Sequence, residues 1–348
     1  MSNFWQKLAK PFTVLAPMED VTDFVFREII CDLAKPDVIF TEFTSSDGLC
    51  SSKGYEYSIK KLLYSKKQRP VVAQIWGSNP NLLYNATHIV KDLKFDGVDI
   101  NMGCPDRGVI KKEAGSALIQ NKQLTGEIIS AVREGAGNMA VSVKTRIGFD
   151  SIVTEDWIRF LLEQKIDALI IHGRTARGKS KIPADWDEIA KAVLLKDKIS
   201  PKTIIIGNGD VKSYAEVVEK HQKYGVDGVM IGRGIFADPW VFDKSPTPKV
   251  HSPQDKINIL LKHTKLFCEK NTILTSEYET SPTLGRGNLS EDFSKSCYKN
   301  FDALKKFFKM YVNNFNGADK IRQQLMECNN FAEVQKVVDL NSCAIKKG

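Results

Sequence analysis

Residues that can do acid and base chemistry stand directly after short apolar runs in this chain. Cys104 follows such a run in a Gly-Cys-Pro turn. An unperturbed thiol has a pKa near ~8.5, so Cys104 would be protonated at neutral pH and able to donate a proton. The seven cysteines form no CxxC pair and no Cys/His cluster at metal-ligand spacing. We therefore expect reduced thiols and no bound metal.

Three further side chains are suited to an electron-rich ring. Lys144 lies in a run that we expect to be otherwise apolar on its inward face, where a lysine is costly unless something electron-rich pairs with it. Beside a flavin, a fixed cation would stabilise the reduced, anionic ring. Gln74 offers a donor and an acceptor to the mixed edge of such a ring. His172, next to Gly173 and Arg174, ends another apolar run.

The last two apolar runs each end in glycines, GNGD at 207–210 and GRG at 232–234. Glycine allows the backbone to approach a ligand closely, and backbone N–H groups after the last two strands of a barrel commonly bind phosphate. Arg233 adds a cation to such a site. The pair of turns thus predicts a phosphate site.

The elements that must position these residues alternate regularly. Apolar runs typical of strands occur at 13–16, 38–41, 71–75, 97–100, 141–144, 168–171, 203–206 and 228–231. Amphipathic stretches typical of helices occur at 23–33, 80–91, 126–133, 155–164, 186–194 and 213–223. Eight strands alternating with helices predict an α/β fold of the (β/α)8 type, a TIM barrel, whose active site lies at the carboxyl ends of the strands. A doubly wound open sheet is the alternative, but the first strand lacks its GxGxxG turn.

The pattern changes after residue 240. Residues 244–253 contain three prolines and are typical of a linker. Helices are expected at 254–270, 301–313, 318–328 and 331–338, with a polar loop at 275–292. We therefore predict a barrel domain over residues 1–243 and a smaller helical domain over 254–348.

Charge and composition narrow the class of protein. The 348 residues carry 50 Lys and Arg against 42 Asp and Glu, and residues 241–348 hold 17 of the former and 12 of the latter. That excess suggests a polyanionic partner, although a solvated helical surface is the plainer alternative. There is no apolar run of membrane-spanning length and no leader peptide, so we expect a cytoplasmic protein with no membrane partner.

At these residues the chain resembles the tRNA-dihydrouridine synthase family. The matching motifs are APMEDVTD (16–23), VAQIWGSNP (72–80), DINMGCP (99–105), AGSAL (114–118), VKTRIG (143–148), HGRT (172–175), PADW (183–186), GNGD (207–210) and GRG (232–234). The resemblance covers residues 13–240 and extends more weakly over 301–333.

The resemblance implies an FMN enzyme that reduces the C5–C6 bond of particular tRNA uridines, with NADPH as the electron source. Cys104 would be the proton donor. Asn101, Arg146 and Arg174 would lie on the substrate side. The residues expected to hold FMN are Pro17, Met18, Glu19, Gln74, Lys144, His172, Asn208, Gly209, Asp210, Gly232 and Arg233. We also expect a monomer whose helical domain binds tRNA through Lys299, Lys305, Lys306, Lys309, Lys320 and Arg322, or else through Lys60, Lys61, Lys66, Lys67 and Arg69 of the barrel.

One segment departs from the family pattern. Residues 176–183 read ARGKSKIP, where many members have a Gln, a Tyr and a Gly. Two other interpretations stay open: a free-pyrimidine FMN oxidoreductase of the dihydroorotate dehydrogenase type, and an RNA-binding protein that has lost catalysis.

Overall fold

The computed structural model describes residues 3–273 and 299–346. The expected loop at 275–292 lies outside the described residues. The chain divides into two compact units, one of residues 1–24 and 36–235 and the other of residues 25–35 and 236–348. Each unit is described by itself below.

The first unit is a closed parallel barrel. Its strands are β1 (Phe12–Leu15), β2 (Val38–Phe40), β4 (Val71–Trp76), β5 (Gly97–Met102), β6 (Ala140–Arg146), β7 (Ala168–His172), β8 (Ile204–Asn208) and β9 (Gly228–Ile231). Each pairs in parallel with the next, β9 pairs with β1, and β2 pairs with β4. The short β3 (Thr44–Ser45) pairs with β4 alone. The predicted TIM barrel is thus confirmed, and each strand overlaps the apolar run that predicted it, although several strands extend further toward their carboxyl ends.

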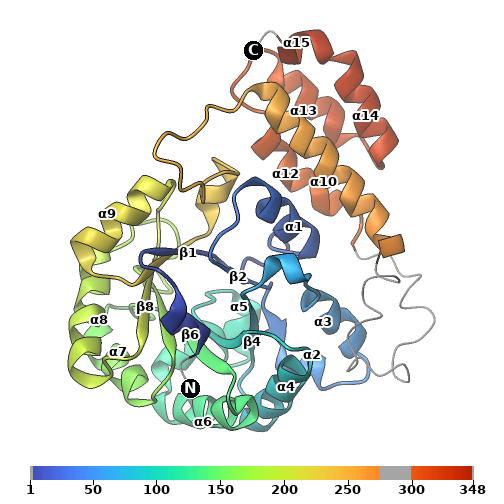
Figure 1. Cartoon of the computed structure of the whole chain (residues 1–348). Coiled ribbons are helices and arrows are strands. Elements are labelled where there is room, and N and C mark those ends of the chain that lie inside the picture. Colours follow the sequence, from blue (N-terminus) through green and yellow to red (C-terminus); the bar gives the residue numbers. More distant parts are fainter. Residues whose placement is uncertain (1–2, 274–298, 347–348) are drawn as a thin grey trace. The chain divides into compact units, whose positions relative to one another are not determined.

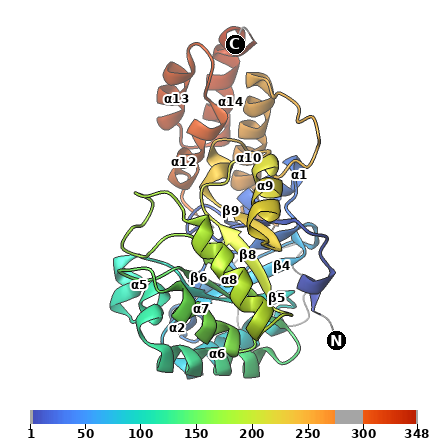
Figure 2. The same ribbon diagram turned by 90° about the vertical axis from the view of Figure 1, so that its left-hand side faces the viewer.

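Helices surround the strands on the outside (Figure 1). They are α4 (Pro80–Asp92), α6 (Lys122–Ala136), α7 (Thr154–Glu163), α8 (Trp186–Ile199) and α9 (Tyr214–Tyr224), with the shorter α2 (Ser46–Leu49), α3 (Tyr55–Lys61) and α5 (Arg107–Lys111) in the connections. Figure 2 shows α8 lying over the outer face of the sheet. Polar side chains cap the amino ends of α4, α6, α8 and α9. Ahead of α4, for example, the Asn79 side chain accepts the backbone N–H groups of Asn81 and Leu82.

The interior of the barrel is apolar at the amino ends of its strands. Phe12, Val14, Phe40, Ile170 and Ile206 belong to one buried cluster with Trp5. The Trp5 ring lies 6.0 Å from Phe12 and 6.4 Å from Phe40, centroid to centroid, and closes that end of the barrel. Because successive side chains of a strand alternate between faces, the inward row on each strand continues toward its carboxyl end, where it becomes polar.

The second unit is helical. It contains α1 (Phe24–Leu33), α10 (Pro253–Ile273), α12 (Asp302–Tyr311), α13 (Ala318–Met326), α14 (Phe331–Leu340) and α15 (Ser342–Lys346). Phe26 of α1 stacks on Phe307 of α12 at 4.9 Å, and Asp32 pairs with Lys262 at 2.9 Å. These contacts explain why residues 25–35 cluster with the C-terminal helices, which the sequence analysis did not foresee. None of the helices described is long and apolar enough to cross a membrane.

Candidate functional site

The side chains singled out in the sequence come together at the carboxyl end of the barrel. Each lies in the carboxyl-terminal half of its strand or in the turn that follows. They are Pro17 and Met18 after β1, Gln74 on β4, Asn101 and Cys104 on and after β5, Lys144 and Arg146 on β6, His172 and Arg174 on and after β7, Asn208 and Asp210 on and after β8, and Arg233 after β9. The strand order brings these ends around one opening. This end of a barrel is where active sites of the fold are built.

The turn that carries Cys104 is tightly bonded. Asn101 Oδ1 accepts the backbone N–H of Gly103 at 3.1 Å and that of Cys104 at 2.9 Å. The Asn101 amide nitrogen donates to Gln74 Oε1 at 3.1 Å. Asn101 is 6% exposed. It therefore orients the turn, and its side-chain oxygen is bonded to backbone groups of the protein.

The thiol of Cys104 is held in its protonated form. Burial raises the pKa of the thiol above its ordinary value. A hydrogen bond with the Asp106 backbone and the nearby cations Arg146 and Lys144 lower the pKa by less. A thiol with a raised pKa carries its proton at neutral pH. The group is thus suited to give a proton and poorly suited to act as a nucleophile.

Gly115 packs directly against this turn, and the sequence reasoning had not singled it out within the AGSAL motif. Its φ is +61°, and an added Cβ would lie 2.9 Å from the Cys104 carbonyl oxygen. The next residue, Ser116, donates its backbone N–H to that same oxygen at 3.0 Å. A glycine is therefore required for the loop to close over the turn.

Lys144 points into the barrel, where little negative charge offsets the charge of its ammonium group. In the part of the chain that the structure describes, no carboxylate pairs with its ammonium group and no acceptor takes a hydrogen bond from it. Burial, and then Arg146, lower its pKa to about 8, while Asp99 acts in the opposite direction. Such a cation favours an electron-rich group in the opening.

Asp99 is a site residue that the sequence analysis missed. It is fully buried, accepts the Ser142 hydroxyl at 2.6 Å and accepts the Gln74 amide nitrogen at 2.8 Å. Burial raises its pKa to about 7, although those hydrogen bonds and Lys144 lower it. The inward face of β6 is thus less apolar than expected around Lys144, because Ser142 shares it. An aspartate two residues before Asn101, on the same face of the strand, was the available signal.

The donor and acceptor of Gln74 are both used within the protein, by Asp99 and Asn101. One amide hydrogen is left for a ligand. These two partners fix the orientation of the amide, with its nitrogen toward Asp99 and its oxygen toward Asn101.

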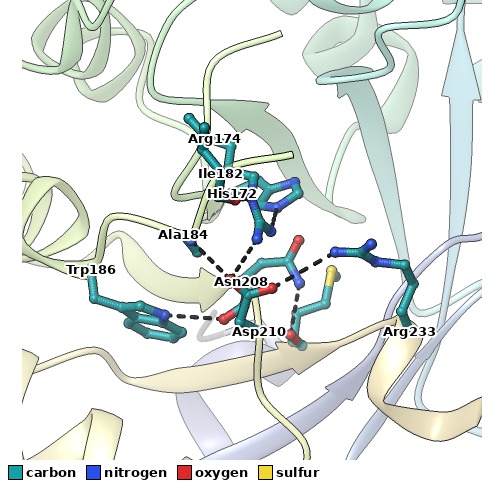
Figure 3. A network of polar contacts seen from close by, with 10 residues as sticks. His172, Arg174, Ile182, Ala184, Trp186, Asn208, Asp210 and Arg233 are labelled. Atoms are coloured by element: carbon teal, nitrogen blue, oxygen red, sulfur yellow. Dashed lines mark hydrogen bonds and ion pairs between the residues drawn. The ribbon is translucent and has the colours of Figure 1, made fainter. Parts of the chain in front are cut away.

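A network around Asp210 joins the ends of β7, β8 and β9 (Figure 3). Arg174 Nη2 pairs with Asp210 Oδ2 at 2.5 Å, and the Ala184 N–H donates to the same oxygen at 2.9 Å. Arg233 Nη2 lies 3.7 Å from Asp210 Oδ1. Asp210 therefore fixes both Arg174 and the backbone at Ala184, and its partners are two arginines and one backbone N–H of the protein.

His172 is neutral and its tautomer follows from its partner. Burial and the cations Lys144, Arg146, Arg174 and Arg233 hold its pKa far below the usual range. Arg174 Nη1 lies 3.1 Å from Nε2, and an arginine can only donate. Nε2 must then be the acceptor, and the proton of the ring sits on Nδ1.

The two glycine turns have different surroundings. Gly209 has a φ of +135°, and an added Cβ would lie 2.5 Å from Ala184 Cβ and 3.3 Å from His172 Cδ2, so only glycine fits beside the imidazole. Asn208 donates to the Met230 carbonyl at 2.8 Å and ties β8 to β9. Gly232 lies opposite Met18, whose sulfur would be 3.5 Å from an added Cβ.

Arg233, in contrast, is largely exposed. Its side chain is 62% accessible, against 3% for Arg174. Arg146 is 7% exposed and donates to two backbone carbonyls. Of the three arginines at the opening, Arg233 is the one most available to a ligand.

Glu19 has its own polar partners, a lysine of α3 and two neighbouring carboxylates. It pairs with Lys61, and one of its oxygens lies within 4.8 Å of carboxylate oxygens of Asp20 and Glu42, a grouping that has the geometry to hold a cation. Burial raises the pKa of Glu19, against the lowering effect of Lys61. The Lys61 ammonium already supplies positive charge to this cluster.

The two sets of basic residues expected to touch RNA differ in their partners. In the barrel, Lys61 is paired with Glu19, and Arg69 with Asp96 at 2.8 Å. In the helical unit a groove of about 410 Å³ is lined by Lys305, Phe308, Lys309, Asp319, Arg322, Gln323 and Met326. Lys305 pairs with Asp302 at 2.7 Å and Arg322 pairs with Asp319, whereas Lys309 is exposed. Lys306 lies outside the lining, as the helical spacing predicts.

Comparisons with known proteins point in one direction. A family model described as "Dihydrouridine synthase (Dus)" matches residues 14–347. A protein of Staphylococcus epidermidis named "Probable tRNA-dihydrouridine synthase" is 39% identical over 338 residues, which is 97% of this chain and 95% of the relative. A Staphylococcus aureus protein of the same name matches at the same identity and coverage. "Probable tRNA-dihydrouridine synthase 2" of Bacillus subtilis is 37% identical over 97% of this chain and 96% of its own length.

Proposed function

The chain belongs to the dihydrouridine synthase family, and from that premise we propose that it reduces the C5–C6 double bond of specific uridines in tRNA with FMN and NADPH. The observation that carries the proposal is a protonated, partly buried thiol just after β5, in the same opening as a lysine of β6 that has no ionic partner among the described residues. One can give a proton, and the other stabilises negative charge.

The residues at the opening fit FMN. The Lys144 ammonium lacks an anionic partner among the described residues, as a cation meant for the electron-rich edge of a flavin would. The Nδ1–H of neutral His172 and the remaining amide hydrogen of Gln74 add two donors for ring acceptors. The glycine turns with the exposed Arg233 suit the phosphate. Asp210 supports this set by holding Arg174 and has no place as a direct phosphate ligand, because both groups are anionic.

When bound, FMN supplies a hydride to C6 of the uracil. Cys104 then gives its proton to C5 from the other face of the base, so that one hydride and one proton saturate the bond. Lys144 would hold the electron-rich edge of the flavin and offset negative charge there. Asn101 keeps the Cys104 turn in register through its two backbone contacts.

The substrate must place one base inside the opening, which requires the uridine to leave its stack. We assign FMN binding and catalysis to residues 1–243 and tRNA binding to residues 254–348, in a cytoplasmic, monomeric enzyme that needs no metal. The groove around Lys309 is the part of the helical unit whose exposed cation suits a phosphate.

The deciding experiment uses purified protein, NADPH and tRNA from cells that lack this protein. We expect a yellow protein with about one FMN bound non-covalently, and new dihydrouridine at defined positions in the tRNA. Colourless protein that cannot be reconstituted with FMN would refute the flavin assignment. Reduction of free uracil or orotate in place of tRNA would favour the dihydroorotate dehydrogenase type.

The tRNA surface has its own test. Lys309→Glu should raise the KM for tRNA and lower the slope of log affinity against log salt by roughly one, because one phosphate contact is lost. Lys91→Glu, in the last turn of α4 in the barrel unit, is the matched charge reversal and should change neither. Equal effects of both variants would point to general electrostatics.

A further inference from the structure

The turn that carries Cys104 leaves no backbone polar group unbonded at its two central residues. The N–H groups of Gly103 and Cys104 donate to Asn101 Oδ1, and the Cys104 carbonyl accepts from Ser116. The fourth group, the Gly103 carbonyl, accepts a hydrogen bond of 2.7 Å from Arg146 Nε. A side chain from the neighbouring strand thus completes the turn.

The guanidinium of Arg146 also contacts the loop after β7. Arg146 Nη1 donates to the Thr175 carbonyl at 3.1 Å. Arg146 is the last residue of β6, which lies between β5 and β7, and its register partner on β7 is His172. One rigid group therefore connects the loop after β5 with the loop after β7.

From these contacts we propose that Arg146 is a positioning residue, a clamp that fixes the Cys104 turn relative to the 172–175 segment. The inference rests on the proposed function, and it gives Arg146 a different task from the substrate contact expected from the sequence. The clamp holds the proton donor at a constant spacing from His172, which faces the same opening.

Arginine suits this task for a geometric reason. Its planar guanidinium presents N–H donors in fixed, diverging directions, whereas a lysine ammonium is a point charge on a flexible stem. Burial, and then Arg174 and Arg233, lower the pKa of Arg146 to about 10, so the group remains a cationic donor at neutral pH. Replacement by lysine should keep the charge and lose the bridge.

The test compares Arg146→Lys and Arg146→Gln with Arg133→Lys, a matched control whose guanidinium donates to the single carbonyl of Gln164 on the barrel surface. Hydrogen exchange of the holoenzyme should speed up at least tenfold in the peptides covering 103–116 and 172–176 together, in both Arg146 variants. Single-turnover oxidation of reduced flavin by tRNA should slow by roughly 10²-fold, the effect of a misplaced reacting group, and by far more than NADPH-dependent flavin reduction. The Kd for tRNA should stay within twofold.

Other results overturn the clamp. Recovery of the rate by Arg146→Lys, with Arg146→Gln still slow, would mean that only the charge matters. A large rise in the Kd for tRNA would make Arg146 a substrate ligand. Unchanged exchange in both loops would remove the structural link, and should one variant fail to fold, the other supplies the exchange data. A wild-type protein that does not reduce tRNA uridines would instead refute the proposed function and leave the exchange result standing.

Discussion

The two ends of the barrel differ in whether their charged side chains have partners within the protein. At the amino end, an aspartate precedes every second strand and accepts the first N–H groups of the strand before it. The four contacts are Asp37 to Thr13 at 2.7 Å, Asp96 to Val71 at 2.8 Å, Asp167 to Val141 at 2.8 Å and Asp227 to Ile205 at 2.8 Å. They join β1 to β2, β4 to β5, β6 to β7 and β8 to β9, so that the barrel consists of four similarly fastened pairs.

At the carboxyl end the charges are mostly cations that gather around one opening. Arg174 is neutralised by Asp210, but Lys144 has no such partner in the described part of the chain. Burial, together with four cations, lowers the pKa of His172 and keeps it neutral. The amino end thus satisfies its polar groups within the chain, and the carboxyl end leaves some for a ligand. Substitutions at the amino end should therefore lower the stability of the fold, and substitutions at the carboxyl end should lower ligand binding or the rate of the reaction.

The largest effect is expected from Cys104→Ala. Oxidation of reduced flavin by tRNA should slow by roughly 10²-fold or more, the usual contribution of a positioned acid, while NADPH-dependent flavin reduction changes far less. Stopped-flow absorbance of the flavin band under anaerobic conditions measures both steps. Equal losses in the two steps would mean that Cys104 supports the flavin site.

Lys144→Met tests whether the lone cation serves a ligand. The Kd for FMN should rise by at least about tenfold, because the charge that balances the ring is lost. The free energy of unfolding of the flavin-free protein should not fall, since an apolar side chain replaces a buried ammonium group without an ion pair. Fluorescence titration with FMN and urea denaturation give the two numbers. A destabilised variant with normal FMN affinity would mean that Lys144 stabilises the fold and does not bind the ligand.

Asp167→Ala tests the opposite end. It leaves the Val141 N–H and the Asn3 amide without their acceptor, so the free energy of unfolding should fall by about 1–3 kcal/mol. The Kd for FMN should stay the same. Asp197→Ala is the control: this exposed aspartate of α8 pairs with its neighbour Lys196, and its loss should change stability by less than about 0.5 kcal/mol. Loss of FMN affinity in Asp167→Ala would show that the two ends are not separable.

The smallest effect concerns pH. The pKa of Asp99 is raised to about 7, so between about pH 4 and pH 7 the unfolded chain has lost a proton that the folded protein keeps. Stability should therefore be greatest below this window and fall as pH rises through it. Asp99→Asn should flatten that part of the curve in urea denaturation of the flavin-free protein. An unchanged slope would assign the pH dependence to other groups.

Some features followed from the sequence because their causes are local. The eight strands and the long helices depend on side-chain periodicity, and Cys104, Lys144 and His172 stand where apolar runs end. Strand ends were placed too early, at 100, 144, 171 and 206, because Asn101, Arg146, His172 and Asn208 are polar yet continue the ladder. Polarity at a strand end marks the opening and does not mark where pairing stops.

Other features needed the fold. Asp99 appears as one polar residue in a strand until β4 and β6 bring Gln74 and Ser142 to it. Asp210 and Arg146 were predicted to contact ligands, and the fold adds that Asp210 pairs with Arg174 and that Arg146 donates to two backbone carbonyls. A charged residue near a site can bind the ligand or hold those that do, and sequence spacing does not separate the two cases.

The sequence by itself therefore determined that the chain forms a parallel barrel with its chemistry at the carboxyl ends of the strands, because alternation of apolar residues and the residues after each run are properties of neighbours in the chain. Only the tertiary structure decided which charges are paired. Three features join residues that are distant in sequence: the aspartates before the strands, the bridge made by Arg146, and the packing of α1 with the C-terminal helices. The energy of a charge depends on the groups that folding brings within a few ångströms of it, and the sequence does not show which groups those are.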